Sequence, residues 1–140
     1  MNPAHCVSNA LQKTARRVAA VYAEEFRACG LGRSQFPLLE TLAAQSEGVA
    51  TSVLARRLDM DRTTLTRTLG PLEKAALVVR ETDALDARIR RVRITPAGLD
   101  KLAEGREAWR RAQSRTLGLV GADAWRDLEE DLRRLRRALS

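Results

Sequence analysis

The chain is predicted to be mainly α-helical, with about six helices and a two- or three-stranded β-ribbon near residues 78–95. Three observations predict this fold class. Apolar residues recur at helical spacing toward both ends of the chain, and residues 90–95 alternate between apolar and polar side chains as a strand does. Directly after that strand, Thr95 and Pro96 supply a capping hydroxyl and a proline suited to the first position of a helix. The 140 residues suit one compact domain, whose core a partner subunit can supplement.

The first helix is expected to run from Val7 to Ala28, where Gly30 and Gly32 end the pattern. Its apolar face consists of residues spaced by three or four positions: Leu11, Ala15, Val18, Tyr22 and Phe26. Such a face needs another apolar surface to pack against.

Two helices separated by a short break are expected in the middle of the chain. Thr51–Leu58 is short and half apolar, and the break after it ends in Asp61, a carboxylate that can accept hydrogen bonds from the free N–H groups of the next helix. That helix, Arg62–Ala76, is expected to bury Leu65, Leu69 and Leu72. Pro71 lies inside it and is expected to bend or locally loosen it.

A β-ribbon and two long helices complete the chain. Residues 77–81 and 90–95 are the predicted strands, and the polar link 82–89 joins them as a wing. A long helix then follows from Pro96, and the last helix carries a seam at alternating spacings of three and four: Trp125, Leu128, Leu132, Leu135 and Leu139. The order helix, break, helix and β-ribbon is that of a winged helix-turn-helix, which presents one helix to a DNA major groove and its ribbon to the neighbouring backbone or minor groove.

The charge balance predicts a polyanionic partner. Lysine and arginine number 25 against 18 acidic residues, for a net charge of +7 and a pI near 10.6. Nearly all of the positive charge is arginine, which binds phosphates and bases through two parallel hydrogen bonds. Charge alone does not separate DNA from RNA or from an anionic membrane.

The compartment is predicted from what the N-terminus and the cysteines show. The N-terminus lacks the order of a signal peptide, and no stretch approaches the roughly 20 apolar residues of a membrane span. We therefore expect a cytoplasmic protein without a membrane partner. Cys6 and Cys29 are too few for a disulfide scaffold and are expected to be thiols.

The helix from Arg62 carries the predicted contacts with the major groove. Hydroxyl and guanidinium groups near its N-terminus can reach phosphates and base edges, and they belong to Arg62, Thr63, Thr64, Thr66 and Arg67. Arg62 has two other possible roles, pairing with Asp61 or binding a phosphate. The alternative for the whole face is an ordinary solvated helix surface.

Five pieces of the chain follow one another in a fixed order and spacing: Leu54-Ala-Arg-Arg-Leu58, Thr63-Thr-Leu-Thr-Arg67, Leu72-Glu-Lys-Ala-Ala-Leu-Val78, Asp86-Ala-Arg88 and Val92-Arg-Ile-Thr-Pro-Ala-Gly98. Together they resemble the signature of the MarR family of bacterial transcription regulators. Gly30–Leu39 is similar to the family's entry into its second helix, so the resemblance covers nearly the whole chain. No single piece would suffice.

The resemblance implies one MarR-like domain over residues 1–140. Residues 1–33 and 99–140 would form an intertwined helical dimerisation region, and residues 34–98 the winged helix-turn-helix. A homodimer of this kind places two recognition helices roughly 34 Å apart over a palindromic site on double-stranded DNA. Its interface would include Leu11, Val18, Trp125, Leu128, Leu132, Leu135 and Leu139. The alternative is that these apolar stripes are core of a single chain.

The family pattern also places an arginine at the wing tip with an aspartate that holds the loop. Arg88 and Asp86 match those positions, and Arg90 and Arg91 are candidates for sharing the backbone contact. Further phosphate contacts are predicted from Ser34, Thr51 and Ser52, which lie near helix starts and have an equal explanation as helix caps.

Two kinds of regulation are consistent with the resemblance. MarR-like dimers commonly bind aromatic acids or phenols between the dimer helices and the winged region. The candidate lining residues are Arg16 or Arg17, Tyr22, Phe26, Phe36 and Trp109, with core packing as the alternative for the aromatics. The other kind is a thiol switch at Cys6, near the start of the first helix and beside His5. The chain lacks the pair of tyrosines common in that subgroup, since Tyr22 is its only tyrosine.

Two further classes of function are alternatives to a regulator. An enzyme is not expected, because His5 is the only histidine and the sequence has no metal-spaced ligands, no glycine-rich phosphate loop and no Ser/His/Asp set; no cofactor or metal is predicted. An architectural protein that coats DNA without sequence preference is the remaining alternative. The sequence favours a homodimeric repressor of a palindromic operator, released by a small aromatic effector.

Overall fold

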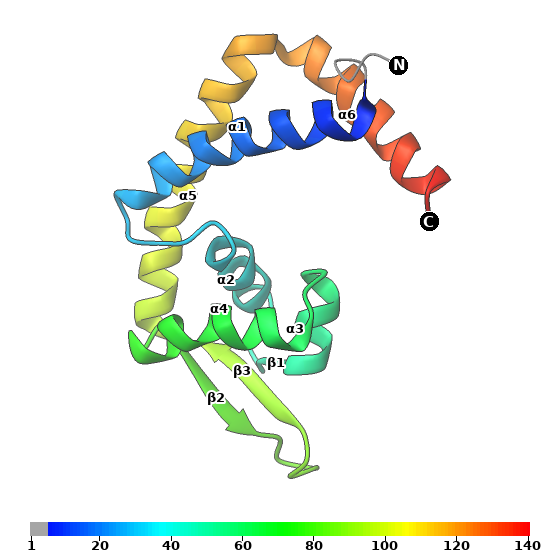
Figure 1. Ribbon diagram of the computed structural model, residues 1–140. Helices are drawn as coiled ribbons and strands as arrows, with labels where there is room; N and C mark the ends of the chain where they lie inside the picture. The colour runs from blue at the N-terminus through cyan, green and yellow to red at the C-terminus, as the bar shows by residue number, and fades with distance from the viewer. Residues whose placement is uncertain (1–5) are drawn as a thin grey trace.

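The computed structural model of the protein describes residues 6–140. Over this range it contains six helices and a small three-stranded sheet (Figure 1), so the predicted fold class is confirmed. In chain order the elements are α1 (Val7–Arg27), α2 (Gln35–Ala43), β1 (Val49–Ala50), α3 (Thr51–Arg57), α4 (Arg62–Lys74), β2 (Val78–Thr82), β3 (Arg90–Ile94), α5 (Pro96–Val120) and α6 (Ala122–Ala138). No helix in the described range is both long and apolar enough to cross a membrane.

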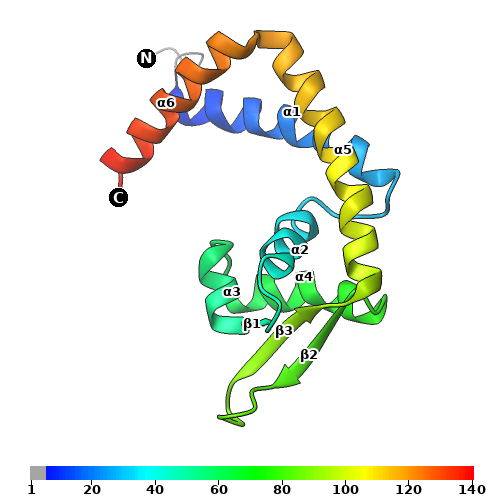
Figure 2. The same cartoon turned by 180° about the vertical axis from the view of Figure 1, so that it is seen from behind.

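The molecule is elongated, with its winged region at one end and a helical arch at the other. In Figures 1 and 2, α5 runs from the base of the sheet to the far end, where α6 turns back and α1 lies inside the bend. The hairpin of β2 and β3 projects away from all of the helices. The start of α1 and the end of α6 therefore lie far from the wing.

The ends of α5 follow from local sequence signals. Thr95 Oγ1 accepts a hydrogen bond from the Gly98 N–H at 3.0 Å, and Pro96 occupies the first turn, as predicted. At the other end Gly121 adopts a φ of +85°, which breaks the helix and lets α6 begin at once. The chain thereby turns a corner between α5 and α6.

The sheet is antiparallel with strand order β1-β3-β2. The hairpin pairs Val78 with Ile94 and Thr82 with Arg90, close to the predicted strands. The two-residue β1, which pairs Val49 with Val92, was not predicted as a strand. α4 continues through Pro71 to Lys74, so the proline does not end the helix.

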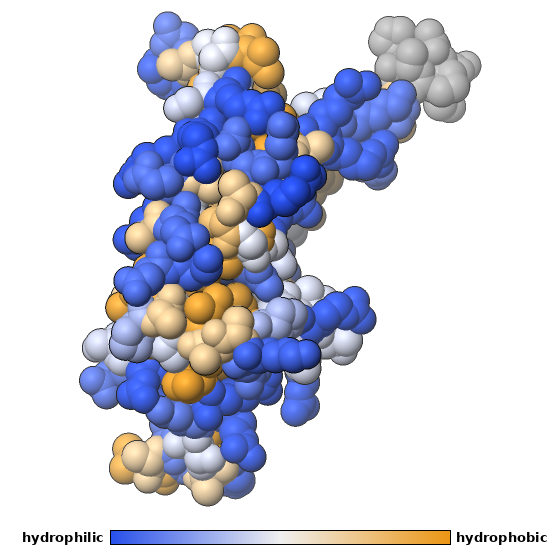
Figure 3. Space-filling model, turned by 90° about the vertical axis from the view of Figure 1, so that its left-hand side faces the viewer, coloured by the Kyte–Doolittle hydropathy of each residue, from blue (hydrophilic) through white to orange (hydrophobic). Residues whose placement is uncertain are grey.

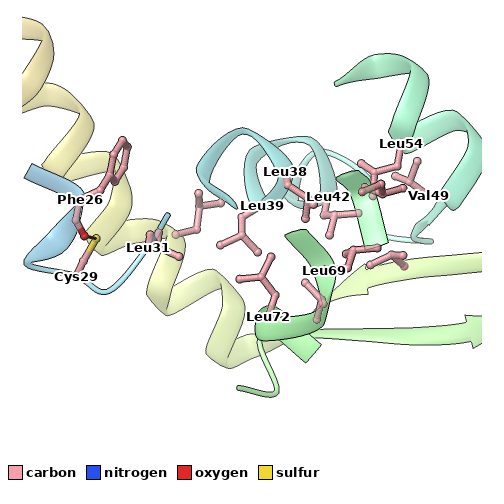
Figure 4. Packing of buried hydrophobic residues seen from close by; sticks show 14 of the residues in the cluster. Phe26, Cys29, Leu31, Leu38, Leu39, Leu42, Val49, Leu54, Leu69 and Leu72 are labelled. Carbon is pink, nitrogen blue, oxygen red and sulfur yellow. Dashed lines mark hydrogen bonds between the residues drawn. The ribbon is translucent and has the colours of Figure 1, made fainter. Parts of the chain in front are cut away.

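The hydrophobic core lies in the winged region and at the adjoining ends of α1 and α5 (Figure 4). Leu38, Leu39, Leu42 and Leu54 are fully buried there. Phe26, expected to line a ligand site, belongs instead to this core, because it is only 2% exposed and its ring centroid lies 5.1 Å from that of Phe36. In contrast, α6 contributes no buried residue.

Ion pairs tie α5 to the helices beside it. Glu25 on α1 accepts hydrogen bonds from Arg111 and Arg115 at 2.8 Å, and these bonds lower the pKa of its carboxyl group. Glu40 on α2 binds Arg106 at 2.7 and 2.9 Å. All of these pairs lie at the surface, so we expect them to orient the helices more than to stabilise them.

Candidate nucleic-acid interface

The N-terminus of α4 is fixed by the aspartate that precedes it. Asp61 Oδ1 accepts a hydrogen bond from the Thr64 N–H at 2.7 Å, which confirms the predicted cap. The bonds from Thr64 hold the pKa of the Asp61 carboxyl group below its usual range. The ion pairs found among residues 6–140 of the winged region do not join Asp61 to Arg62, so this alternative role of Arg62 is not supported.

One face of α4 packs into the core and the other faces solvent. Leu65, Leu69 and Leu72 are buried, as predicted. The polar residues of the N-terminal half are exposed: Arg62, Thr63, Thr64, Thr66 and Arg67. The structure therefore groups them as one continuous polar surface next to the wing.

A cleft of about 340 Å³ separates α4 from α3 and the wing. We call it the arginine cleft, because its lining includes Arg62, Arg80 and Arg90 together with the hydroxyl-bearing Thr51, Ser52 and Thr66. Arg80 pairs with Glu73, whereas Arg62 and Arg90 take no part in the ion pairs found among residues 6–140 of the winged region. Two uncompensated guanidinium groups at one opening suit a phosphate.

Arg80 also lines the arginine cleft, although it was not among the residues predicted from the sequence to contact DNA. It sits on β2, at a position paired with Val92 of β3, and only the folded hairpin brings it beside α4. Its place two residues after the buried Val78 was the available signal.

The wing tip is held by two aspartates. Asp86 accepts hydrogen bonds from the Arg88 backbone N–H at 3.0 Å and from its guanidinium group at 3.1 Å. Arg88 is nevertheless 90% exposed at its side chain, so its charge is oriented and remains open to a partner. This arrangement agrees with the predicted pairing of Asp86 and Arg88.

The second aspartate, Asp83, was not predicted to hold the wing. Its carboxylate accepts hydrogen bonds from the Leu85 and Asp86 N–H groups at 3.0 and 3.1 Å and forms an ion pair with Arg91. Arg91 also donates to the Gly48 carbonyl at 3.3 Å. Arg91 was expected to share the backbone contact with Arg90, but these bonds turn it toward the loop before β1.

The three residues near helix starts that were predicted to contact phosphates, Ser34, Thr51 and Ser52, make no capping bonds. Ser34 is at the N-cap position of α2 without a side-chain cap, and α3 begins after Ala50, so Thr51 and Ser52 lie in its first turn. Thr51 and Ser52 instead line the arginine cleft. The capping explanation for these three side chains is therefore wrong.

The residues predicted to bind an effector do not form one site. Phe36 and Trp109 line a pocket of about 650 Å³ between α2, α3 and α5, which we call the aromatic pocket. Tyr22 lies elsewhere, where its hydroxyl binds Gln113 and burial raises its pKa. Arg16 and Arg17 are exposed on α1, and the cations beside the aromatic pocket are Arg57, Arg106 and Arg110.

A second concave surface lies under the helical arch. This apolar groove of about 610 Å³ is lined from α1, α5 and α6, and it includes five of the predicted interface residues: Leu11, Val18, Trp125, Leu128 and Leu132. Leu135 lies further along α6 and Leu139 directly follows its end, and they are 38% and 78% exposed. Because α6 buries no residue within the chain, the alternative of a single-chain core is not supported for this helix.

The two cysteines differ in access. Cys6 is exposed and directly precedes α1, whereas Cys29 is buried and its thiol lies 3.3 Å from the Phe26 carbonyl oxygen. His5, expected to assist Cys6, lies outside the described residues.

Comparisons with known proteins agree with this geometry. The sequence profile of the MarR family matches residues 30–89, which include α2, α3, α4 and most of the wing. The chain is 31% identical over 120 residues to the uncharacterized HTH-type transcriptional regulator YdgJ of Bacillus subtilis, covering 85% of this chain and 73% of that protein.

Solved structures share the whole architecture. The transcriptional regulator MosR of M. tuberculosis, in complex with DNA, is 30% identical with a TM-score of 0.81, and the match covers 96% of each chain. The transcriptional repressor CouR, bound to a 23-mer DNA duplex, is 25% identical with a TM-score of 0.88 over 95% of this chain and 94% of that one.

Proposed function

Because the chain belongs to the MarR family of DNA-binding transcription regulators, we propose that it acts as a homodimeric repressor of a palindromic operator, released by a small aromatic acid. As expected from the sequence, its relatives are transcription regulators and not enzymes. The observation that carries the proposal is the joined surface of α4, the arginine cleft and the wing, which gathers oriented cations around an exposed recognition helix.

The DNA contacts are divided by their chemistry. Thr63, Thr64 and Arg67 are proposed to face base edges in the major groove, since they are exposed near the N-terminus of α4. The arginine cleft is proposed to hold a backbone phosphate between α4 and the wing. Arg88 is proposed to enter the neighbouring minor groove.

The apolar groove supports the dimer. A second copy of the chain is the proposed occupant, because the elements that line the groove also carry exposed apolar residues at the end of α5 and directly after α6, among them Leu119, Val120 and Leu139. Two copies related by a two-fold axis would present two recognition helices to a palindromic site. In support of repression, one similar structure is a repressor bound to DNA.

The test is a titration of the protein against the DNA upstream of its own gene and against scrambled DNA of equal length, at about 50 and 200 mM salt. We expect at least hundredfold tighter binding to the upstream DNA than to the scrambled DNA. Sequence-specific proteins typically bind their sites about 10³-fold or more tightly than non-specific DNA. Equal binding to both duplexes at both salt concentrations would instead favour an architectural protein, which binds through phosphates alone.

The aromatic pocket supports the aromatic acid as effector. Phe36 and the half-exposed Trp109 offer flat apolar surfaces, and Arg57, which takes no part in the ion pairs found among residues 6–140, offers a charge for a carboxylate, whereas Arg106 and Arg110 pair with Glu40 and Glu107. The pocket is lined from α2, α3 and α5. A bound effector would therefore change how the winged region is placed relative to α5.

Salicylate is a suitable probe for this pocket. We expect it to quench the fluorescence of Trp109 in a Trp125→Phe protein, and to weaken DNA binding at the same concentrations. A Trp109→Phe protein, which keeps Trp125, is the matched control and should show no quenching. DNA binding that is unaffected at saturating quenching would contradict release by this pocket.

The exposed thiol of Cys6 favours one second candidate, an oxidation sensor. Peroxide should then release DNA from the wild-type protein and from Cys29→Ser, but not from Cys6→Ser. Equal release from Cys6→Ser would rule out this switch.

A further inference from the structure

The wing tip presents an exposed apolar side chain three residues before the exposed Arg88. Leu85 is 98% exposed, the highest value among the large apolar residues described, and Ile89 on the same loop is 39% exposed. Figure 3 shows apolar atoms at the lower end of the molecule, where the wing ends, below a band of hydrophilic residues. An apolar residue in this place is not explained by packing within the chain.

The backbone that carries Leu85 is well fixed. The Leu85 N–H donates to Asp83 Oδ2 at 3.0 Å, and the loop closes through hydrogen bonds between Asp83 and Ile89 at 2.9 Å and between Ile89 and Asp86 at 3.0 Å. The Asp83 carboxylate is in turn bound by Arg91. The side chain of Leu85 is therefore held out in solvent at a defined place relative to Arg88.

We propose that Leu85 packs against the deoxyribose walls of the operator's minor groove while Arg88 neutralises the groove beside it. The proposal rests on the proposed DNA-binding function and adds an apolar contact to it. The minor groove is only about 6 Å wide, and minor-groove proteins use leucine among the apolar side chains that they place there. Ala84 and Ala87, the small neighbours of Leu85 and Arg88, leave room for such an approach.

DNA is favoured over a protein as the occupant by charge and by continuity. Arg88 and Arg90 flank the apolar tip, and Arg90 also lines the arginine cleft next to α4, so the tip extends the proposed DNA surface. The large apolar residues of the tip are Leu85 and Ile89, which offer far less than the roughly 1,200 Å² that a specific protein interface buries.

The experiment uses a duplex that the wild-type protein selects from a random pool. We expect Leu85→Ala and Leu85→Asn to bind this duplex about tenfold more weakly, because each variant loses the burial of part of a leucine side chain. Because no charge is removed, the slope of log affinity against log salt should stay the same, whereas Arg88→Ala should reduce it by about two, one for each wing of the proposed dimer. Leu99→Ala, an exposed leucine at the start of α5, is the matched control and should bind as the wild type does.

Hydroxyl-radical footprinting gives a second measurement, because it reports the exposure of deoxyribose. Sugars of the minor groove under the wing should be protected by the wild type and exposed in the Leu85→Ala complex. Undiminished affinity or unchanged protection in the Leu85 variants would overturn this inference. The proposed DNA-binding function would then still stand. If the wild type selects no duplex from the pool, the proposed function fails and this inference fails with it.

Discussion

Single residues of the wing divide two tasks between them. Asp83 and Asp86 shape the loop by accepting backbone hydrogen bonds, and each also binds one arginine. Arg91 has a structural role, because its guanidinium group binds Asp83 and the Gly48 carbonyl, whereas the side chain of Arg88 stays in solvent. The ion pair of Arg91 therefore serves the fold of the wing, whereas that of Arg88 leaves a charged side chain open to a binding partner. The two arginines are only three residues apart.

Acidification is expected to loosen the wing. The bond from Arg91 to Asp83, and that from Arg88 to Asp86, hold the pKa of each carboxyl group below its usual range. Their stabilising contribution is therefore complete above the unfolded value of about 3.9 and is lost as the pH falls through the lower folded pKa. Carboxyl-carbon NMR titrations should give midpoints below that value for both aspartates.

The two arginine variants serve as reciprocal controls for this titration. Arg88→Ala should return the midpoint of Asp86 toward the ordinary value and leave Asp83 low, and Arg91→Ala should do the reverse. Ordinary midpoints in the wild type would contradict the wing geometry.

Arg88 itself is expected to contribute to DNA affinity. Arg88→Ala should weaken operator binding by about ten- to a hundredfold if the side chain enters the minor groove, because a groove contact is worth more than a solvated phosphate contact. Arg134→Ala, on α6, removes another exposed arginine that pairs with an aspartate and should have no such effect. Equal affinity of Arg88→Ala and wild type in a binding titration would refute the wing assignment.

At the scale of elements, the start of α5 joins the sheet to the long helix through a glycine. A Cβ atom on Gly98 would lie 2.1 Å from the Leu77 carbonyl oxygen and 2.6 Å from Ile94 Cγ1. The helix can therefore lie against the end of the hairpin only because residue 98 has no side chain.

Gly98→Ala is expected to destabilise the protein by about 3 kcal/mol, the upper range for overpacking a tight contact. Gly118→Ala in the same helix is the matched control, because its Cβ atom meets nothing within 4 Å, and it should keep or slightly raise stability. Chemical denaturation at one protein concentration measures both. A Gly98→Ala protein as stable as wild type would show that the helix can shift away from the sheet.

Elements with local signals were predicted well, and those fixed by distant partners were not. Asp61 and the pair Thr95 and Pro96 mark helix starts through bonds within one turn, so the sequence predicted both starts correctly. The strand Val49–Ala50 is only two residues long and exists through its pairing with β3, more than forty residues later, which no local pattern reveals. The inward turn of Arg91 likewise depends on Asp83, across the wing.

The candidate sites show the same division. The outward face of α4 follows from helical spacing, so it was predicted residue by residue. Aromatic residues were assigned to a ligand site by type alone, and packing then placed Phe26 in the core and separated Tyr22 from Trp109. The contacts of all these residues with DNA or an effector stay predictions.

At the scale of the whole molecule, one chain leaves the helical arch incomplete. Helix α6 has an apolar seam and no buried residue, and its Trp125, Leu128 and Leu132 face the apolar groove. A second copy completes the arch in the proposed dimer.

Leu132→Asp is expected to dissociate the dimer and abolish DNA binding, because it would bury an unpaired charge in an apolar interface. Light scattering should show the mass falling from twice the 15.6 kDa of the chain to a single copy. Arg137→Asp introduces the same side chain on the outer face of α6 and should remain dimeric. A Leu132→Asp protein that stays dimeric would show that this helix is outside the interface.

The unbroken length of α5 determines how far a small movement travels. Its 25 residues span about 37 Å at 1.5 Å per residue, from the sheet to the corner with α6. Treated as a stiff lever of that length, the helix would carry a tilt of about 5° at the arch into a displacement of about 3 Å at the other end. That displacement is close to the roughly 3.4 Å between successive bases of one strand. A tilt too small to alter the packing of the arch or of the winged region would therefore displace the recognition surface along its DNA by about one base pair.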